Sequence, residues 1–203
     1  MTIADFERKF TARPPGILGV SEHYAVLVPL VDRGGALHLL FETRAAGLRR
    51  QPGEVCFPGG RMERGETPTD CALRETWEEL GIPTSAVRPI APLDVIYHHS
   101  GFLLHPVLAQ VETGAALRLR LNPQEVVEAF LVPLSFFREH PPQMGAYALQ
   151  PKAEDNFPYE SIGVDGGYDW KSGRVEVPVY RYEGHPIWGM TGRIVRHLID
   201  EME

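Results

Sequence analysis

The sequence has few cysteines, no long apolar run and no excess of basic residues. Only Cys56 and Cys71 occur among its 203 residues. Both have apolar neighbours, so we expect free thiols and neither a disulfide framework nor a zinc site. No apolar run is long enough to cross a bilayer, and the N-terminal residues include acids where a secretory signal carries bases. These absences predict a cytoplasmic protein without a membrane partner.

The charge balance is acidic. There are 27 Asp and Glu against 20 Lys and Arg, which gives a net charge of -7. Such a chain repels nucleic acids and anionic lipid surfaces, so we expect no nucleic-acid partner, while divalent cations would suit it. The composition, with 43% hydrophobic and 23% charged residues, predicts a single globular domain over residues 1–203. It leaves a homodimer open.

Strand and helix patterns follow one another without a regular repeat. Residues 140–175 are rich in Pro, Gly and aromatic residues and predict an irregular loop with short strands. We expect strands at 23–31, 36–41, 54–57, 88–97, 106–113, 129–134 and 175–182, and helices in the first dozen residues and at 68–80, 135–139 and 190–199. This order predicts an α+β fold in which helices flank a mixed β-sheet.

The helix expected at 68–80 has an unusual acidic face near its end. Glu75, Glu78 and Glu79 recur at spacings of three and four, where like charges repel by roughly 0.2–0.5 kcal/mol per pair. They also oppose the helix dipole. A divalent cation would reverse both effects, because clustered carboxylate oxygens are its preferred ligands. The alternative is a solvated acidic face on which Arg74 pairs with Glu78.

Residues 60–82 resemble the signature segment of the Nudix hydrolases, the Nudix box. The segment reads Gly60-x5-Glu66-x7-Arg74-Glu75-Thr76-Trp77-Glu78-Glu79-Leu80-Gly81-Ile82. It departs from the family pattern at Thr76, where an aliphatic residue is usual. The resemblance implies an α/β/α sandwich that uses Mg²⁺ or Mn²⁺ to hydrolyse the pyrophosphate bond of a small molecule.

The resemblance also implies residue roles. The three acids of the helix face would be metal ligands, the backbone of Gly60 would shape the site, and Glu66 and Arg74 would orient the acids. Glu79 could also be the general base, and the sequence does not separate base from ligand. Family members often supply a further carboxylate from a downstream loop, for which Glu125 is the candidate, although an exposed turn acid is an equal alternative. The candidate catalytic acids are Glu78, Glu79 and Glu125, and the candidate metal ligands are Gly60, Glu75, Glu78 and Glu79.

Residues 40–60 look like the accessory motif of the coenzyme A pyrophosphatase subfamily. The matching elements are Arg49, Gly53 and the run Phe57-Pro58-Gly59-Gly60, while Phe41-Glu42 stands where the subfamily shows Leu-Thr. This resemblance implies hydrolysis of coenzyme A or a derivative to adenosine 3′,5′-bisphosphate and 4′-phosphopantetheine. The alternatives are another nucleoside diphosphate derivative, such as ADP-ribose or a dinucleotide, and a nucleotide sensor without turnover. The intact acids of the box argue against the sensor.

Three arginines precede the acidic helix in an otherwise acidic chain. Arg44, Arg49 and Arg50 are candidates for substrate phosphates, because guanidinium groups match phosphate oxygens. Solvated surface pairs are the alternative. Trp188 is expected in the core rather than under an adenine ring.

Overall fold

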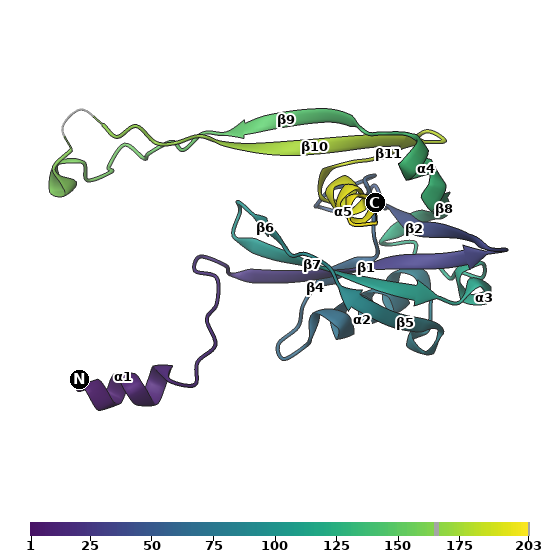
Figure 1. Ribbon diagram of the computed structural model, residues 1–203, viewed down its shortest axis with the longest axis horizontal. Coiled ribbons are helices and arrows are strands. Elements are labelled where there is room, and N and C mark those ends of the chain that lie inside the picture. The colour runs from purple at the N-terminus through teal and green to yellow at the C-terminus, as the bar shows by residue number, and fades with distance from the viewer. Residues whose placement is uncertain (165–166, 203) are drawn as a thin grey trace.

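The computed structural model describes residues 1–164 and 167–202 and centres on a mixed β-sheet (Figure 1). Strand β1 (Glu22–Arg33) runs parallel to β7 (Phe102–Val111) and antiparallel to β2 (Ala36–Arg44). The strand order is β3-β2-β1-β7-β5, and β4, β6 and β8 pair with β1, β7 and β2. The remaining strands of this sheet are β3 (Val55–Cys56), β4 (Gly59–Arg61), β5 (Val87–Pro92), β6 (Ile96–His98) and β8 (Val126–Pro133).

A long helix covers each face of the sheet. Helix α2 (Pro68–Leu80) contributes Ala72 and Leu80 to one buried cluster, and α5 (Gly189–Asp200) contributes Ile194 and Val195 to the other. Strand residues alternate between the two clusters, because successive side chains of a strand point to opposite faces. The short helices are α3 (Thr113–Ala116), α4 (Leu134–Glu139) and the 3₁₀ turns η1 (Thr84–Ala86) and η2 (Glu160–Ile162). The expected mixed sheet flanked by helices is confirmed.

Residues 140–175, expected to be largely irregular, contain one long strand and the start of another. β9 (Gln143–Leu149) pairs with β10 (Gly173–Tyr182), and β11 (His185–Ile187) completes a second, three-stranded sheet. The hairpin packs on α5 near its base, and its tip extends well beyond the body of the protein (Figure 1). Residues 165 and 166 of this segment lie outside the described residues.

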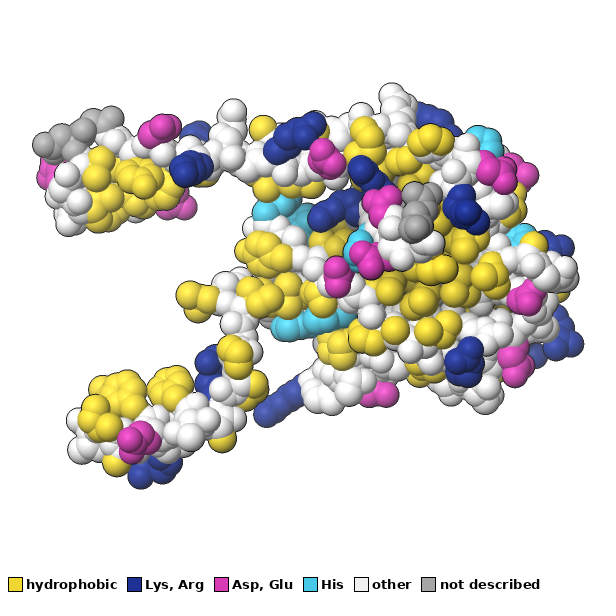
Figure 2. Space-filling view, in the orientation of Figure 1, with side chains coloured by type: hydrophobic (Ala, Val, Ile, Leu, Met, Phe, Trp, Pro, Cys, Tyr) yellow, Lys and Arg dark blue, Asp and Glu magenta, His cyan; other side chains and the backbone are white. Residues whose placement is uncertain are grey.

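The expected N-terminal helix is α1 (Ile3–Phe10), and it also stands away from the sheet (Figure 1). Its apolar residues Ile3, Phe6 and Phe10 are exposed. Figure 2 shows hydrophobic side chains gathered on both this helix and the tip of the hairpin. Across the described residues, no helix has the length and apolar character needed to span a membrane.

Candidate active site

The ends of α2 are set by local sequence, as expected. The Thr67 hydroxyl accepts a hydrogen bond from Asp70 N at 3.2 Å, and Thr67 N donates to the Asp70 carboxylate at 3.3 Å. Gly81 ends the helix with a left-handed φ of 68°. Such a reciprocal cap and a glycine C-cap fix where a helix begins and stops. The boundaries of the helix therefore follow from its own sequence, while its packing on the sheet buries Glu79.

Glu79 is the most deeply buried of the three box acids. Its side chain is 4% exposed, and its Oε2 accepts a hydrogen bond of 2.8 Å from Gly59 N. Burial, followed by the charge of Glu42, raises the pKa of Glu79 to about 9. A carboxyl group with a raised pKa is a stronger proton acceptor near neutral pH once it is ionised. A cation beside it would favour the ionised form.

Glu75 lies directly against the glycine loop that precedes α2. A Cβ atom added to Gly60 would lie 2.3 Å from both Cδ and Oε1 of Glu75, so only glycine lets the loop approach this carboxylate. Burial raises the pKa of Glu75, and hydrogen bonding from Arg74 opposes that rise. The proximity of Gly60 to an inward-facing acid fits the role expected of its backbone.

Arg74 holds the acids of this region together. Its Nε lies 2.9 Å from Glu66 Oε1, and its Nη1 lies 2.7 Å from Glu75 Oε1 and 3.1 Å from Glu78 Oε2. Hydrogen bonding from Arg74 lowers the pKa of Glu66. The pair of Arg74 with Glu78, considered as the alternative to a metal site, therefore exists, but Arg74 is the centre of a network and not one partner of a solvated pair.

The donors at this site are carboxylate oxygens, which Mg²⁺ and Mn²⁺ prefer over nitrogen or sulfur. Among the described residues, no three His, Cys, Asp or Glu side chains stand in an arrangement that could share one ion. In the present contacts, Arg74 engages Glu75 and Glu78, and Gly59 N engages Glu79. Binding of a cation would require these carboxylates to turn from their present partners. The residues fit a divalent cation by their chemistry.

Two further acids lie near the α2 carboxylates. Glu125 is partly buried, its backbone oxygen accepts a 2.7 Å hydrogen bond from Ala45 N, and its charge contributes to raising the pKa of Glu75. Glu42 is fully buried on β2, and the sequence reasoning did not select it. A charged residue directly after the apolar run Leu39–Phe41 was the signal that could have identified it.

A cavity of about 760 Å³ opens next to the glycine loop, and Gly59 and Gly60 form part of its wall. Of the three arginines selected from sequence, Arg44 and Arg50 line the cavity, whereas Arg49 is not among its lining residues. Nη1 of Arg50 donates a 2.9 Å hydrogen bond to the hydroxyl of Tyr24. The structure thus brings two of the three arginines to the cavity that adjoins the box acids.

Residues distant in sequence complete the cavity wall. Tyr147 and Val175 are paired across β9 and β10 toward the outer end of these strands, and Arg193 comes from α5. Trp188 also lines the cavity and is 42% exposed, so its expected place in the core is wrong. The fully buried residue at this point is its neighbour Ile187.

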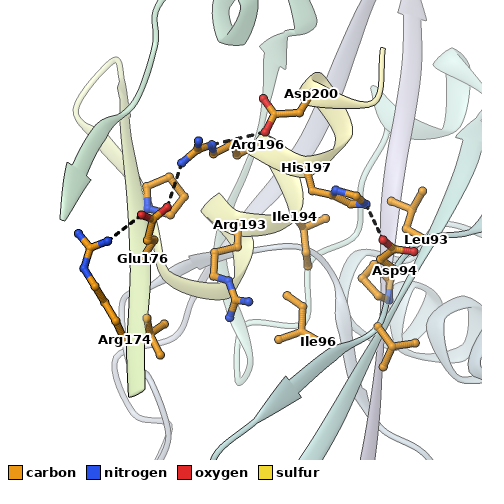
Figure 3. Close-up of a pocket in the computed structure, with 14 residues that line it drawn as sticks. Leu93, Asp94, Ile96, Arg174, Glu176, Arg193, Ile194, Arg196, His197 and Asp200 are labelled. Atoms are coloured by element: carbon orange, nitrogen blue, oxygen red, sulfur yellow. Dashed lines mark hydrogen bonds and ion pairs between the residues drawn. The ribbon is translucent and has the colours of Figure 1, made fainter. Parts of the chain in front are cut away.

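A smaller cavity of about 480 Å³ lies beside α5 (Figure 3). Its wall carries ion pairs between Arg196 and Glu176 at 3.6 Å and between His197 and Asp94 at 3.3 Å. None of its lining residues belongs to the box. The larger cavity, whose wall includes Gly59 and Gly60 of the glycine loop, is therefore the better candidate for chemistry.

The NUDIX domain matches residues 21–148. The peroxisomal coenzyme A diphosphatase NUDT7 of Mus musculus is 40% identical over 118 residues, covering 58% of this chain and 49% of that protein. Nudix hydrolase 3 of Caenorhabditis elegans is 40% identical over 112 residues, covering 54% of this chain and 47% of that protein. The chain thus matches about half the length of these two relatives.

Other relatives match over nearly the whole chain. The uncharacterized Nudix hydrolase NudL of Yersinia enterocolitica is 30% identical over 209 residues, covering 99% of this chain and 93% of that protein. A MutT/nudix family protein from Enterococcus faecalis has a similar structure, with a TM-score of 0.51 and 15% identity over 98% of this chain and 70% of that chain. That likeness concerns the fold alone. The domain match and the long alignment show that the chain belongs to the Nudix hydrolase family.

Proposed function

We propose that the protein hydrolyses the pyrophosphate bond of coenzyme A or one of its derivatives, using Mg²⁺ or Mn²⁺. The observation that carries this proposal is the double role of the glycine loop. Gly59 binds Glu79 and Gly60 lies against Glu75, and both glycines line the 760 Å³ cavity. A substrate in this cavity would therefore meet the acids of α2. The volume lies within the range of small-molecule and cofactor sites.

Each residue of the proposed site has its own role in the hydrolysis. Glu75, Glu78 and Glu79, with the backbone of Gly60, would hold a divalent cation. When bound, such a cation would neutralise the polyanionic substrate and lower the pKa of a water molecule, so that the water loses a proton more readily and becomes a better nucleophile. Glu79 or Glu125 would accept the proton of the attacking water, and Arg74 would orient the carboxylates through its contacts with them.

The preference for coenzyme A rests on the cavity wall and on the resemblance of residues 40–60. Arg44, Arg50 and Arg193 line the cavity, and guanidinium groups are the preferred partners of phosphates. Coenzyme A carries a 3′-phosphate in addition to its pyrophosphate, so it needs more such partners than ADP-ribose does. The diphosphatase activity in the name of the mouse relative supports the same substrate.

A hydrolysis assay with a panel of substrates tests the proposal. Coenzyme A, acylated coenzyme A, ADP-ribose, NADH and diadenosine polyphosphates would each be incubated with Mg²⁺ or Mn²⁺ and their products identified. We expect the highest kcat/KM for coenzyme A or a derivative, with release of adenosine 3′,5′-bisphosphate. A higher kcat/KM for ADP-ribose or a dinucleotide would assign the enzyme to that substrate. Binding without turnover of any compound would indicate a sensor.

A further inference from the structure

Glu42 occupies a position in the sheet where its side chain faces α2. Leu40, two residues earlier on β2, packs in the same cluster as Leu80 of α2, whereas Phe41 packs in the cluster that includes α5. Because strand side chains alternate, Glu42 points to the side of Leu40. Its partner on β8, Ala129, also packs against the α2 cluster. Glu42 thus faces the helix that bears the box acids.

The carboxylate of Glu42 has too few partners for its burial. Its side chain is fully buried. Oε1 accepts a weak hydrogen bond of 3.5 Å from Cys56 Sγ, while Oε2 has no partner among the described residues. Nε of the nearby Arg44 is also buried without a partner, so that side chain does not neutralise Glu42 through this nitrogen. A buried carboxylate in this state is costly unless it is protonated or binds a cation.

The surroundings of Glu42 are acidic and adjoin the proposed active site. Burial raises the pKa of Glu42 to about 7 against the hydrogen bond from Cys56 and the charge of Arg44, and the charges of Glu125 and Glu75 add to the rise. Glu42 in turn is the largest cause, after burial, of the raised pKa of Glu79. Cys56, the residue in contact with Glu42, lines the 760 Å³ cavity. Glu42 therefore lies close enough to two proposed cation ligands to affect their charge, and it contacts a residue of the cavity wall.

We propose that Glu42 is a further carboxylate ligand of the divalent-cation site, supplied by β2 opposite the acids of α2. This inference rests on the proposed function, because it requires that α2 binds a cation. A cation between β2 and α2 would give the unpartnered oxygen of Glu42 its missing partner. It would also screen the repulsion between Glu42 and Glu79.

The test measures cation binding and does not depend on turnover. Mn²⁺ affinity would be determined by electron paramagnetic resonance and calorimetry for the wild type, Glu42→Gln and Glu42→Thr. The threonine variant restores the residue that the resembling subfamily carries there. Thr43→Val is the matched control, because it alters the adjacent β2 residue, whose side chain points to the opposite face. Thermal melts in EDTA would show that each variant is folded.

We expect both Glu42 variants to bind Mn²⁺ about tenfold to a hundredfold more weakly than the wild type, the usual cost of losing a charged hydrogen-bonding or ligating group. Thr43→Val should bind as the wild type does. Unchanged Mn²⁺ affinity in both folded Glu42 variants, together with weakened binding by Glu79→Gln, would overturn the role of Glu42 and leave the proposed function intact. A wild type that binds no Mn²⁺ would overturn both.

Discussion

Replacing Glu79 by glutamine should stabilise the metal-free protein, and the gain should grow with pH. The pKa of this buried carboxyl is raised from 4.5 to about 9, first by burial and then by the charge of Glu42. The folded state therefore holds a proton that the unfolded chain releases above pH 4.5. Stability that is complete below pH 4.5 is lost as the pH rises toward about 9. Glutamine cannot ionise and escapes this loss.

The size of this stability difference follows from the raised pKa of Glu79. Each pH unit between the unfolded and folded pKa values costs about 1.4 kcal/mol. From pH 4.5 to neutrality the wild type should lose about 3 kcal/mol that Glu79→Gln retains. This figure already includes the repulsion of Glu42, because that charge is one of the causes of the raised pKa. Saturating Mg²⁺ should reverse the order, because a ligand that binds only the folded state stabilises it by mass action.

Urea unfolding in EDTA at several values between about pH 5 and pH 8 measures this difference directly. Glu78→Gln is the matched control, because the Glu78 side chain is 49% exposed on the same helix turn. Its offset from the wild type should be smaller than that of Glu79→Gln, because half of this side chain is in solvent. A pH-independent offset for Glu79→Gln would refute the reasoning, since it would mean that burial does not hold a proton on this carboxyl.

Three other changes test the rest of the site. Gly60→Ala should weaken Mn²⁺ binding measured by calorimetry, because its Cβ would overlap the Glu75 carboxylate, whereas Gly47→Ala, with no atom within 4 Å of the new Cβ, should not. Arg50→Ala should raise KM for coenzyme A about tenfold to a hundredfold, with much less effect on KM for dephospho-coenzyme A. Arg49→Ala is the control, because Arg49 lies outside the cavity lining. Equal losses on both substrates would place Arg50 on the pyrophosphate or in the scaffold. Deletion of residues 153–167 should change the ratio of activities on free and acylated coenzyme A, because the strand ends that carry this segment line the cavity through Tyr147 and Val175. An unchanged ratio in a folded variant would limit the tip to packing or contacts between copies.

The sequence predicted those elements whose signals are local. Helix α2 spans Pro68–Leu80, as expected, because its cap and its terminal glycine are neighbours in the chain. The expected strand at 88–97 is instead divided into β5 and β6. β9 had no alternating pattern to reveal it, because six of its seven residues are exposed. It forms through pairing with β10, more than twenty residues later, and such pairing leaves no periodic trace.

In the candidate site, too, only the residues that are neighbours in the chain could be predicted from the sequence. The box acids share one helix, so their spacing alone predicted a common face. The acid Glu42 and the cavity residue Arg193 lie on other elements, and their positions depend on how β2 and α5 pack against the rest of the sheet. Trp188 illustrates the same limit, because an aromatic residue at a helix start fits either a core or a cavity wall until the helix is placed.

Strand β2 places an aromatic ring and a charge in consecutive residues, on opposite faces of the sheet. A slip of its pairing by one residue would exchange them, because strand side chains alternate. Glu42 would then enter the apolar cluster around Phe57, and Phe41 would displace the acid opposite α2. Pairing of β2 with β1, β3 and β8 would have to break for this to happen. Glu42, whose unpartnered burial destabilises the metal-free protein, thus also disfavours forms in which β2 is paired out of register during folding.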